Sequence, residues 1–335
     1  MLTFTLRRLL LAIPTLLVIS LVIFLLVDLA PGSPMSEIPL TVPPDVRRKM
    51  IEALGADQPV FFRYFLWLRQ FFWVEPVTLF DGWFGTSWAG GEQRILSWQS
   101  RAPVFTIIGQ RIPQTLTVIG TAYLVGILIA LPIGIYSAYR QYSLFDQLGT
   151  LIAMIGFSVP TFFSGTLIII IFAVTLGWFP TKYDTNLHVT DWASFVKQLQ
   201  QMAMPVMTLG LANAAVISRY MRSSMLDNMG MDYVRTARAK GLTERVVVLK
   251  HVLRNSMIPV VTVIALGIPS IFGGAIITEN LFGVNGIGAA LIGAIHASDL
   301  PMVQTLAFIF AVLIVTFNLI ADVLYGLLDP RIRYD

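Results

Sequence analysis

The sequence predicts an all-α integral membrane protein with six transmembrane helices and a small external subdomain after the first of them. Hydrophobic residues make up 56% of the chain and charged residues only 13%, whereas soluble proteins contain about 25% charged residues. Six apolar runs are each long enough to cross roughly 30 Å of hydrocarbon. The absence of cysteine excludes a disulfide framework and cysteine-based metal sites, and it leaves the redox compartment open.

The first apolar run follows Arg7 and Arg8 and is longer than the apolar core of a signal peptide. No small-residue cleavage site follows it, so we expect an uncleaved helix. The predicted spans cover residues 9–29, 113–137, 148–176, 204–222, 257–281 and 302–326.

Loop charges predict the orientation of these spans. The segment between the fourth and fifth spans has an excess of basic residues, which marks the cytoplasmic side. Six crossings then place both termini, with Arg7, Arg8, Arg331 and Arg333, in the cytoplasm. Residues 282–301 contain no Lys or Arg and are expected to form an outer loop. The basic residues of the cytoplasmic segment are Arg222, Arg235, Arg238, Lys240, Arg245, Lys250 and Arg254, against Asp227, Asp232 and Glu244.

Residues 31–112 form the predicted external subdomain. Prolines and glycines at 31–34 and 43–44 interrupt it, and residues 63–73 have the pattern of an amphipathic, aromatic helix. Its tryptophans either lie at the membrane interface or contact a partner protein. We favour the interface, because amphipathic rings gather at the level of the headgroups. These tryptophans are Trp67, Trp73, Trp83, Trp88 and Trp98.

Motifs of enzymatic chemistry are not found in the sequence. There is no Gly-Lys pair and hence no P-loop for nucleotide phosphates, and His188, His251 and His296 are expected in three different loops, which argues against a metal cluster. The run Gly283-Val284-Asn285-Gly286-Ile287-Gly288 follows an apolar helix rather than a strand, so we interpret it as a tight turn at the outer face. We therefore expect no catalytic residue, metal or cofactor in this chain.

Polar residues in the apolar runs are the remaining candidates for function. Asp28, Glu279 and Asp322 lie near the ends of runs, where we interpret them as interfacial carboxylates. Asn213 and Asn318 lie deeper, and together with Ser158 they are candidate pathway residues; the alternative is that they only tie helices together.

Glycine and proline interrupt several predicted spans. Ser158-Val159-Pro160 and Phe163-Ser164-Gly165 are expected to break the third span, and Pro205 to open the fourth. Pro259, Gly267, Pro269, Gly273 and Gly274 are expected to interrupt the fifth. Broken helices suit a moving pathway, but small residues also permit close helix crossing in proteins that do not move.

A short polar segment between the fourth and fifth spans predicts a docking helix for a soluble protein. Its small side chains allow another surface to approach closely, its basic residues favour an acidic partner, and Gly241 can adopt the left-handed geometry that ends a helix. A basic helix held by anionic lipids would explain the charges but not the alanines. The segment reads Asp232-Tyr233-Val234-Arg235-Thr236-Ala237-Arg238-Ala239-Lys240-Gly241-Leu242.

This segment and eight further motifs resemble permease subunits of bacterial ABC importers, in the peptide and nickel branch, and the resemblance spans essentially the whole chain. The nearest resemblance is to dipeptide and oligopeptide permeases of the B type. The further motifs, in order, are Arg7-Arg8-Leu9 with Ile13-Pro14, Pro31-Gly32-Ser33-Pro34, Arg111-Ile112-Pro113-Gln114-Thr115-Leu116, Ser158-Val159-Pro160-Thr161-Phe162, Leu176-Gly177-Trp178-Phe179-Pro180, Arg222-Ser223-Ser224-Met225-Leu226, Thr278-Glu279-Asn280-Leu281-Phe282 and Asp329-Pro330-Arg331.

The resemblance implies the type I ABC importer permease fold and the following organisation. Residues 1–30 would form the first transmembrane helix, 31–112 the periplasmic subdomain, 113–329 the transporter domain with a coupling segment at 223–256, and 330–335 a cytoplasmic tail. The chain would reside in the bacterial inner membrane and assemble with a homologous second permease, two ATPases that bind ATP and Mg²⁺, an external solute-binding protein and membrane lipids, but with no nucleic acid.

Residues 233–242 would contact an ATPase, with Ala237 and Ala239 in its groove, Arg235, Arg238 and Lys240 on its acidic rim, and Gly241 ending the helix. Arg235 stands where ABC importers in general have glutamate, so it cannot supply that carboxylate. Peptides are the expected substrate. Nickel chelates, glutathione and opine-like compounds are the alternatives within the branch, and a stand-alone ion-coupled carrier is an alternative outside it.

Overall fold

The computed structural model describes residues 2–29, 58–273 and 276–328. The motifs at 31–34, 43–44 and 329–331, residue Gly274 and the predicted tail lie outside these residues. The regular elements of the described residues are helices, and one isolated antiparallel bridge joins Leu96 to Pro103.

In chain order, the α-helices and the short π-helical turns (η) are α1 (Leu2–Asp28), α3 (Val60–Arg69), η1 (Gln70–Val74), α4 (Glu75–Phe84), α5 (Val104–Thr115), η2 (Leu116–Gly120), α6 (Thr121–Tyr139), α7 (Leu144–Ser158), α8 (Thr161–Ile168), η3 (Ile169–Thr175), α9 (Trp192–Met229), α10 (Asp232–Ala239), α11 (Glu244–Val246), η4 (Val247–Val252), α12 (Leu253–Gly273), α13 (Ile276–Phe282), α14 (Ile287–His296) and α15 (Leu300–Leu328).

The chain divides into two compact units. Unit 1 comprises Met1–Leu9, Pro113–Ala289 and Ile314–Asp335, and unit 2 comprises Leu10–Ile112 and Ala290–Leu313.

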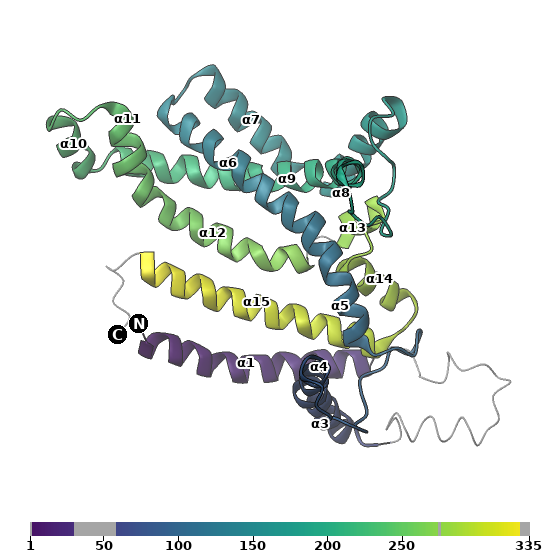
Figure 1. The fold of residues 1–335 in the computed structure, drawn as a ribbon. Coiled ribbons are helices and arrows are strands. Elements are labelled where there is room, and N and C mark those ends of the chain that lie inside the picture. The colour runs from purple at the N-terminus through teal and green to yellow at the C-terminus, as the bar shows by residue number, and fades with distance from the viewer. Residues whose placement is uncertain (1, 30–57, 274–275, 329–335) are drawn as a thin grey trace. The chain divides into compact units, whose positions relative to one another are not determined.

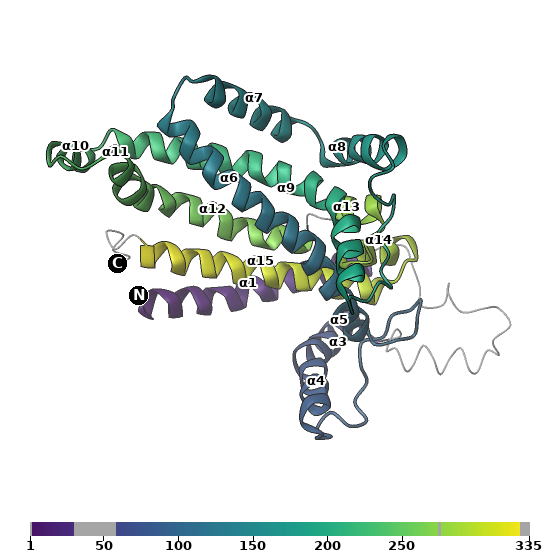
Figure 2. The same cartoon turned by 45° about the horizontal axis from the view of Figure 1, so that its top comes forward.

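Unit 1 is organised around α9, which packs against α6, α7 and α12 (Figures 1 and 2). Glycines allow α6 to approach α9 closely: a Cβ atom on Gly126 would lie 2.9 Å from the carbonyl oxygen of Gly210, and one on Gly134 would lie 2.7 Å from that of Ser218. This is the small-residue packing by which membrane helices gain contact without a hydrophobic driving force between them.

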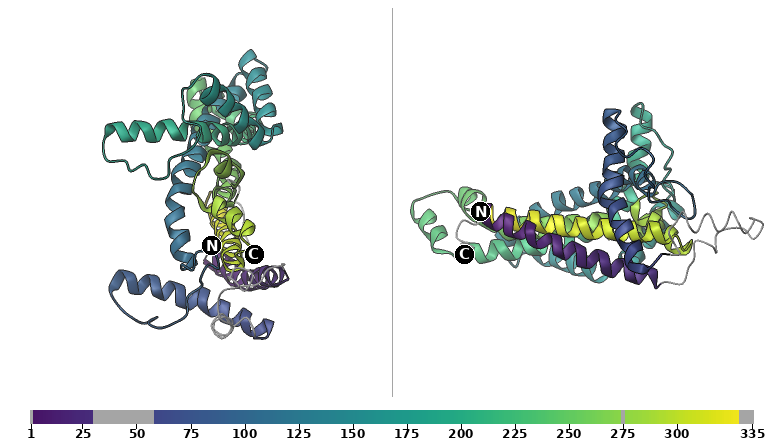
Figure 3. Two further views of the ribbon diagram at one scale, coloured as in Figure 1. Left: turned by 90° about the vertical axis from the view of Figure 1, so that its right-hand side faces the viewer. Right: turned by 90° about the horizontal axis from the view of Figure 1, so that it is seen from below.

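Unit 2 contains a continuous helical rod, α3–η1–α4, that crosses the direction of α1 (Figure 3). A cluster of aromatic rings joins the rod to α1 and to the first turns of α15. Trp67 lies 6.3 Å from Phe24 and 5.3 Å from Phe308 between ring centroids, and Phe71 lies 4.8 Å from Phe308. The predicted aromatic helix at 63–73 is thus confirmed.

Among the residues that the structure describes, five helical runs are long and apolar enough to cross a membrane: Thr5–Asp28, Val104–Tyr139, Trp192–Met229, Glu244–Pro269 and Leu300–Val323. Two further pairs of helices pass the same test but are bent, by 106° between α7 and α8–η3 and by 88° between α13 and α14. Counting each pair as one span gives up to seven, so the number six stays a prediction.

The structure corrects several details of the predicted spans. The third span breaks at Val159-Pro160 as expected, because the residue before proline is driven out of the helical region, but Phe163–Gly165 lies inside α8. Pro205 lies inside α9 rather than opening it. That helix starts at Trp192, because Asp191 and Ser194 form a reciprocal cap. The first turns of α9 contain polar side chains, so the start of the helix cannot be recognised from a run of apolar residues.

The fifth predicted span is also less broken than expected, since α12 continues through Pro259, Gly267 and Pro269 to Gly273. Neighbouring helices and local adjustment let transmembrane helices accommodate proline. The predicted outer loop at 282–301 contains the helix α14. This helix is apolar, but it is too short to be recognised as a run of about 20 apolar residues. Of the three histidines, only His188 lies in a loop, because His251 is in η4 and His296 ends α14.

Candidate functional site

The short helix α10 connects α9 to the η4–α12 segment and contains the predicted docking residues. Val234 is fully buried and Ala237 is 5% exposed, whereas Arg235, Thr236, Arg238 and Ala239 are exposed. An isolated helix of eight residues is not stable in water, so the burial of its inner face must hold it in place. Full burial of a valine side chain contributes about 1.5–3 kcal/mol.

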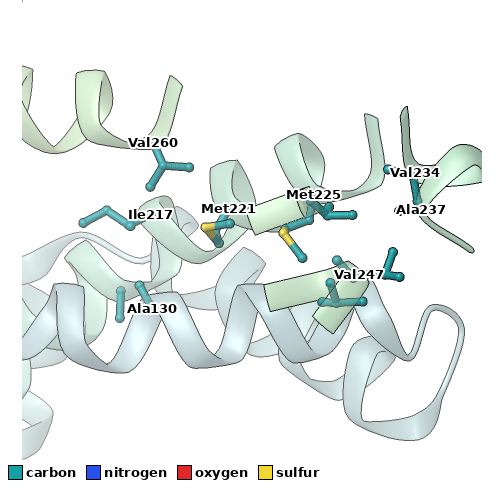
Figure 4. Close-up of a cluster of buried hydrophobic side chains, with 12 residues drawn as sticks. Ala130, Ile217, Met221, Met225, Val234, Ala237, Val247 and Val260 are labelled. Carbon is teal, nitrogen blue, oxygen red and sulfur yellow. The ribbon is translucent and has the colours of Figure 1, made fainter. Parts of the chain in front are cut away.

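The inner face of α10 belongs to a buried apolar cluster, which we call the α10 cluster (Figure 4). Val234 and Ala237 share this cluster with Met221 and Met225 of α9 and Val247 of η4, and the cluster extends to α6 and α12. Because close-packed cores transmit strain, a displacement of α10 would be felt through this cluster by η4 and by the long helices that share the cluster. The cluster consists of Ala130, Ala138, Ala214, Ile217, Met221, Met225, Val234, Ala237, Val247, Val248, Val252 and Val260.

Gly241 ends α10 in the geometry expected from the sequence. Its φ angle is +77°, in the left-handed region, and its amide donates a hydrogen bond to the carbonyl of Arg238 at 2.9 Å. The amide of Lys240 donates to the carbonyl of Thr236 at 3.1 Å, so two terminal carbonyls of the helix have partners.

The charges on the outer face are partly balanced within the chain. Arg238 binds Glu244 at 2.7 Å, and this hydrogen bond raises the pKa of the guanidinium. Arg235 lies 3.5 Å from Asp232, and both side chains are largely exposed. Exposed pairs of this kind contribute little to stability, so Arg235, Arg238 and Lys240, which follows the helix, stay accessible to an acidic surface.

The placement of Ala237 differs from the expectation. Ala237 and Ala239 are two residues apart, and at 3.6 residues per turn they point about 200° away from each other. Ala237 and Ala239 therefore cannot both occupy the same groove of a partner. The structure turns Ala237 inward and leaves Ala239 as the small residue of the exposed face. The helical period of 3.6 residues is sufficient to exclude, from the sequence alone, an arrangement in which the two alanines share one groove.

A chain of buried and partly buried hydrogen bonds, which the sequence did not reveal, links α10 to α9 and α12. The hydroxyl of Tyr233 donates to the side-chain oxygen of Asn228 at 2.7 Å, and the Asn228 amide donates to the carbonyl of Ser224 at 2.9 Å. Ser224 in turn donates to the carbonyl of Ser256 on α12, also at 2.9 Å. The Ser256 hydroxyl lies 3.1 Å from the Ser224 carbonyl and 2.9 Å from that of Val252.

An ion pair between a buried carboxylate and a half-buried guanidinium joins α7 to α9 near the same end of α9. Arg222 binds Asp146 in a two-point geometry, with Nε–Oδ1 and Nη2–Oδ2 distances of 2.6 Å and 2.8 Å, and the amide of Tyr142 donates to the same carboxylate at 2.9 Å. Asp146 is 3% exposed. The planar fork of the guanidinium matches a carboxylate, which gives this contact directional specificity as well as charge balance.

A second buried carboxylate lies at the other end of unit 1 and corrects the interfacial interpretation of Glu279. Glu279 is fully buried; it accepts hydrogen bonds from the Thr115 hydroxyl at 2.7 Å and from the amide of Ala289 at 2.9 Å. Thr115 accepts a hydrogen bond from the amide of Ile287 at 2.9 Å. Two side chains thus cap the N-terminus of α14, where a carboxylate is favoured by the helix dipole. We call Thr115, Glu279 and the first turn of α14 the α14 clamp.

Two family matches and several relatives identify the chain. Residues 130–334 match the family described as the binding-protein-dependent transport system inner membrane component, and residues 1–119 match its N-terminal part. This chain belongs to that family. It is 36% identical to the oligopeptide transport system permease protein AppB of Bacillus subtilis and 37% identical to the glutathione transport system permease protein GsiC of Salmonella typhimurium, each over 100% of both chains.

The resemblance to ABC importer permeases of the peptide and nickel branch is therefore confirmed. As a binding-protein-dependent inner membrane component, the chain is a multi-pass helical membrane protein, which agrees with its apolar helices. Two of the motifs that carried the resemblance meet in the α14 clamp: the segment with Thr115 and the segment with Glu279.

The candidate pathway residues of this permease are not joined by hydrogen bonds. Ser158 and Asn318 are exposed, whereas Asn213 is half-buried, and the position of a Cβ on Gly126 would be 3.0 Å from the Asn213 Cβ. Across the described part of the chain, none of the three makes a side-chain hydrogen bond. Their role in a pathway stays a prediction. No group of three or more His, Cys, Asp or Glu side chains that could hold a metal ion occurs among the described residues.

Proposed function

We propose that this chain is one of two permease subunits of an ATP-driven importer and forms half of a translocation pathway for peptides. Its partners would be a homologous permease, two cytoplasmic ATPases that bind ATP and Mg²⁺, and an external solute-binding protein. Family membership supports the import machinery, and the permease of Bacillus subtilis named for oligopeptide transport supports a peptide substrate. Both termini would lie in the cytoplasm, on the side of the basic segment between α9 and α12.

The observation that carries this proposal is the two-sided character of α10. Its outer face presents a small residue, Ala239, among basic groups, while its inner face is held in the α10 cluster. A helix that served only as a connection between α9 and α12 would need the inner face but not the outer one. We therefore assign the outer face of residues 233–242 to contact with an ATPase.

Movement of the ATPases would reach the membrane helices through α10. The α10 cluster and the hydrogen bonds from Tyr233 to Ser256 connect α10 to α9 and α12, so a displaced α10 would carry both helices with it. The ATPases must contact α10 differently in their ATP-bound and free states, because a ligand shifts an equilibrium only by its differential affinity for the two states.

A single exposed substitution tests the ATPase contact. Ala239→Glu adds a carboxylate to the outer face without filling the α10 cluster, and a charge left buried and unpaired in an interface costs about 2–5 kcal/mol. We expect ATPase association to weaken about 30-fold or more and uptake to be lost, while the chain still inserts into the membrane.

Gln141→Glu, an exposed position in the turn between α6 and α7, is the matched control and should leave association unchanged. Co-purification with the ATPases and uptake would be measured for both variants. Normal association of the Ala239→Glu variant would refute the contact, and purification of an active transporter without any ATPase would favour a stand-alone carrier.

Glutathione is the second candidate substrate, because the permeases of Salmonella typhimurium and Escherichia coli named for glutathione transport are as similar to this chain as the oligopeptide permease is. Binding of di- and oligopeptides and of glutathione to the purified solute-binding protein, together with competition for uptake, distinguishes the two. Saturable binding of glutathione alone would move the assignment away from peptides in general.

A further inference from the structure

The rod α3–η1–α4 of unit 2 carries a continuous face of exposed aromatic side chains. It runs over both α-helices and the π-helical turn between them, and Trp88 stacks on it by lying 5.5 Å from Phe80 between ring centroids. A single exposed apolar residue needs no explanation, but a contiguous face of this kind marks an interaction site. This outer face consists of the aromatic residues Phe61, Phe62, Phe65, Phe72, Trp73, Phe80, Trp83 and Phe84, together with Leu79.

The opposite side of the rod is apolar as well. Tyr64, Trp67, Phe71 and Val74 are buried, and the rings of the first three pack on Phe24 of α1 or Phe308 of α15 within unit 2. A helix that is apolar all round is normally surrounded by other apolar material, either a protein core or hydrocarbon. The composition of the rod therefore predicts that apolar material also covers its outer face, and no part of unit 2 that the structure describes does so.

The four charged side chains of residues 60–84 all have partners within unit 2. Arg63 binds Asp28 at 2.6 Å, Arg69 binds Glu92 at 2.5 Å, and the buried Glu75 binds Arg94 at 2.6 Å. The fourth, Asp81, accepts hydrogen bonds from the Thr86 hydroxyl and from the amides of Trp88 and Ala89 at 3.1 Å and 2.8 Å.

Internal pairing lowers the cost of bringing these charges near hydrocarbon. A surface shaped for an acidic or basic protein partner would instead leave charges free to complement it.

The contacts of the rod with α1 set its depth. Tyr64 packs on Phe24 at 5.4 Å between ring centroids, and Arg63 reaches Asp28, the last residue of the membrane-spanning run. With a rise of about 1.5 Å per residue, Phe24 lies about 6 Å inside that end of α1. Interfacial helices bury their apolar face about 5–10 Å into the boundary between headgroups and acyl chains. The rod also lies across α1, as a helix in the plane of a bilayer must (Figures 2 and 3).

We propose that the outer face of α3–η1–α4 lies in the lipid interface of the outer leaflet, with its aromatic rings among the headgroups and upper acyl chains. Trp73 and Trp83 are two of these membrane contacts. Trp67, which the sequence suggested for the same role, is 6% exposed and belongs to the aromatic core of unit 2. The rod anchors unit 2 laterally and holds the outer end of α1 at a constant depth.

Nitroxide labels can test the proposal, because the native chain contains no cysteine and single cysteines can be introduced at chosen sites. Phe65→Cys, Trp73→Cys and Trp83→Cys would be labelled in the assembled transporter, reconstituted in bilayers of phosphatidylethanolamine and phosphatidylglycerol. Electron paramagnetic resonance then measures collisions of each label with oxygen, which concentrates in lipid, and with a nickel chelate, which stays in water. Gln99→Cys is the exposed control and Phe71→Cys the buried one, and retained uptake verifies the fold of each variant.

We expect the three labels on the outer face to collide several-fold more with oxygen than with the nickel chelate, and the Gln99→Cys label to show the reverse. High accessibility to the nickel chelate on the outer face would overturn the proposal, because the rod would then lie in water. Low accessibility to both reagents, as at Phe71, would also overturn it and would show instead that a protein covers the rod.

Discussion

Replacing Glu279 with alanine is expected to open the α14 clamp. The substitution leaves the Thr115 hydroxyl and the amide of Ala289 without the acceptor that lies 2.7 Å and 2.9 Å from them. Each buried donor that loses its partner costs about 1–3 kcal/mol, so the loss for the two donors is roughly 2–6 kcal/mol. Glu279→Gln keeps one acceptor oxygen and the shape of the side chain, so its effect should be smaller.

A substitution of Gly286 perturbs the same site in the opposite way, because it adds an atom where Glu279→Ala removes several. A Cβ atom on this glycine would overlap the Glu279 carboxylate and the Thr115 hydroxyl, so Gly286→Ala should destabilise the wild-type protein by about 1–3 kcal/mol through overpacking. In the Glu279→Ala background the carboxylate is gone and much of the space is free. The double variant should therefore be more stable than the sum of the two single effects predicts, with a coupling of about 0.5–3 kcal/mol.

Hydrogen exchange of the amides at residues 287–289, together with the thermal unfolding midpoint in detergent, measures these effects. Where local opening controls the exchange of an amide, a decrease of 2 kcal/mol in the free energy of opening makes the exchange roughly 30-fold faster. Gly293→Ala in α14 is the control, because a Cβ there would have no neighbour within 4 Å. Wild-type exchange in Glu279→Ala, or strictly additive effects in the double variant, would refute the clamp.

Three further predictions concern other parts of unit 1. Gly241→Pro should abolish transport while membrane insertion persists, because proline fixes φ near −65° where the native value is +77° and removes a donated hydrogen bond; uptake equal to wild type would contradict this. Arg222→Met should lower stability by roughly 3 kcal/mol, since it leaves the buried Asp146 carboxylate without its cation, and Arg222→Lys should recover only part of the loss in thermal unfolding. The amide of Ser194 donates a hydrogen bond to the Asp191 carboxylate and lowers the pKa of that carboxyl. The cap therefore stabilises the start of α9 fully above the ordinary carboxyl pKa of about 3.9. This stabilisation is lost as the pH falls through the lowered pKa of Asp191 in the folded protein. Protection from hydrogen exchange in the first turn of α9, relative to the unfolded chain at the same pH, should therefore fall below about pH 4, and an Asp191→Asn variant that showed the same pH dependence would contradict the assignment.

Local chemistry made parts of the candidate site predictable. The end of α10 at Gly241 follows from a glycine after a short helical pattern, and its left-handed geometry was expected because only glycine adopts it without strain. The break at Val159-Pro160 follows from the steric effect of proline on the residue before it.

Other parts of the site depend on contacts between residues far apart in the sequence. Glu279 looks like an interfacial carboxylate until Thr115 and the first turn of α14 are placed around it. The hydrogen bonds from Ser224 to Ser256 join residues of two helices, and no local pattern pairs them. Trp67 and Trp73 are both tryptophans of the rod α3–η1–α4, and it is the packing of rings such as Phe24 and Phe308 around Trp67 that makes it a core residue.

By itself the sequence determined the membrane environment, the helical class, the basic segment between the fourth and fifth predicted spans and the relationship to importer permeases. These features depend on the transfer of apolar side chains from water and on local backbone preferences, which act over a single helix or turn. The tertiary structure alone decided which face of α10 points outward, which carboxylates are buried and which aromatic rings remain exposed. A helix has no inside or outside until another helix covers one of its faces, and that choice is made by packing over the whole chain.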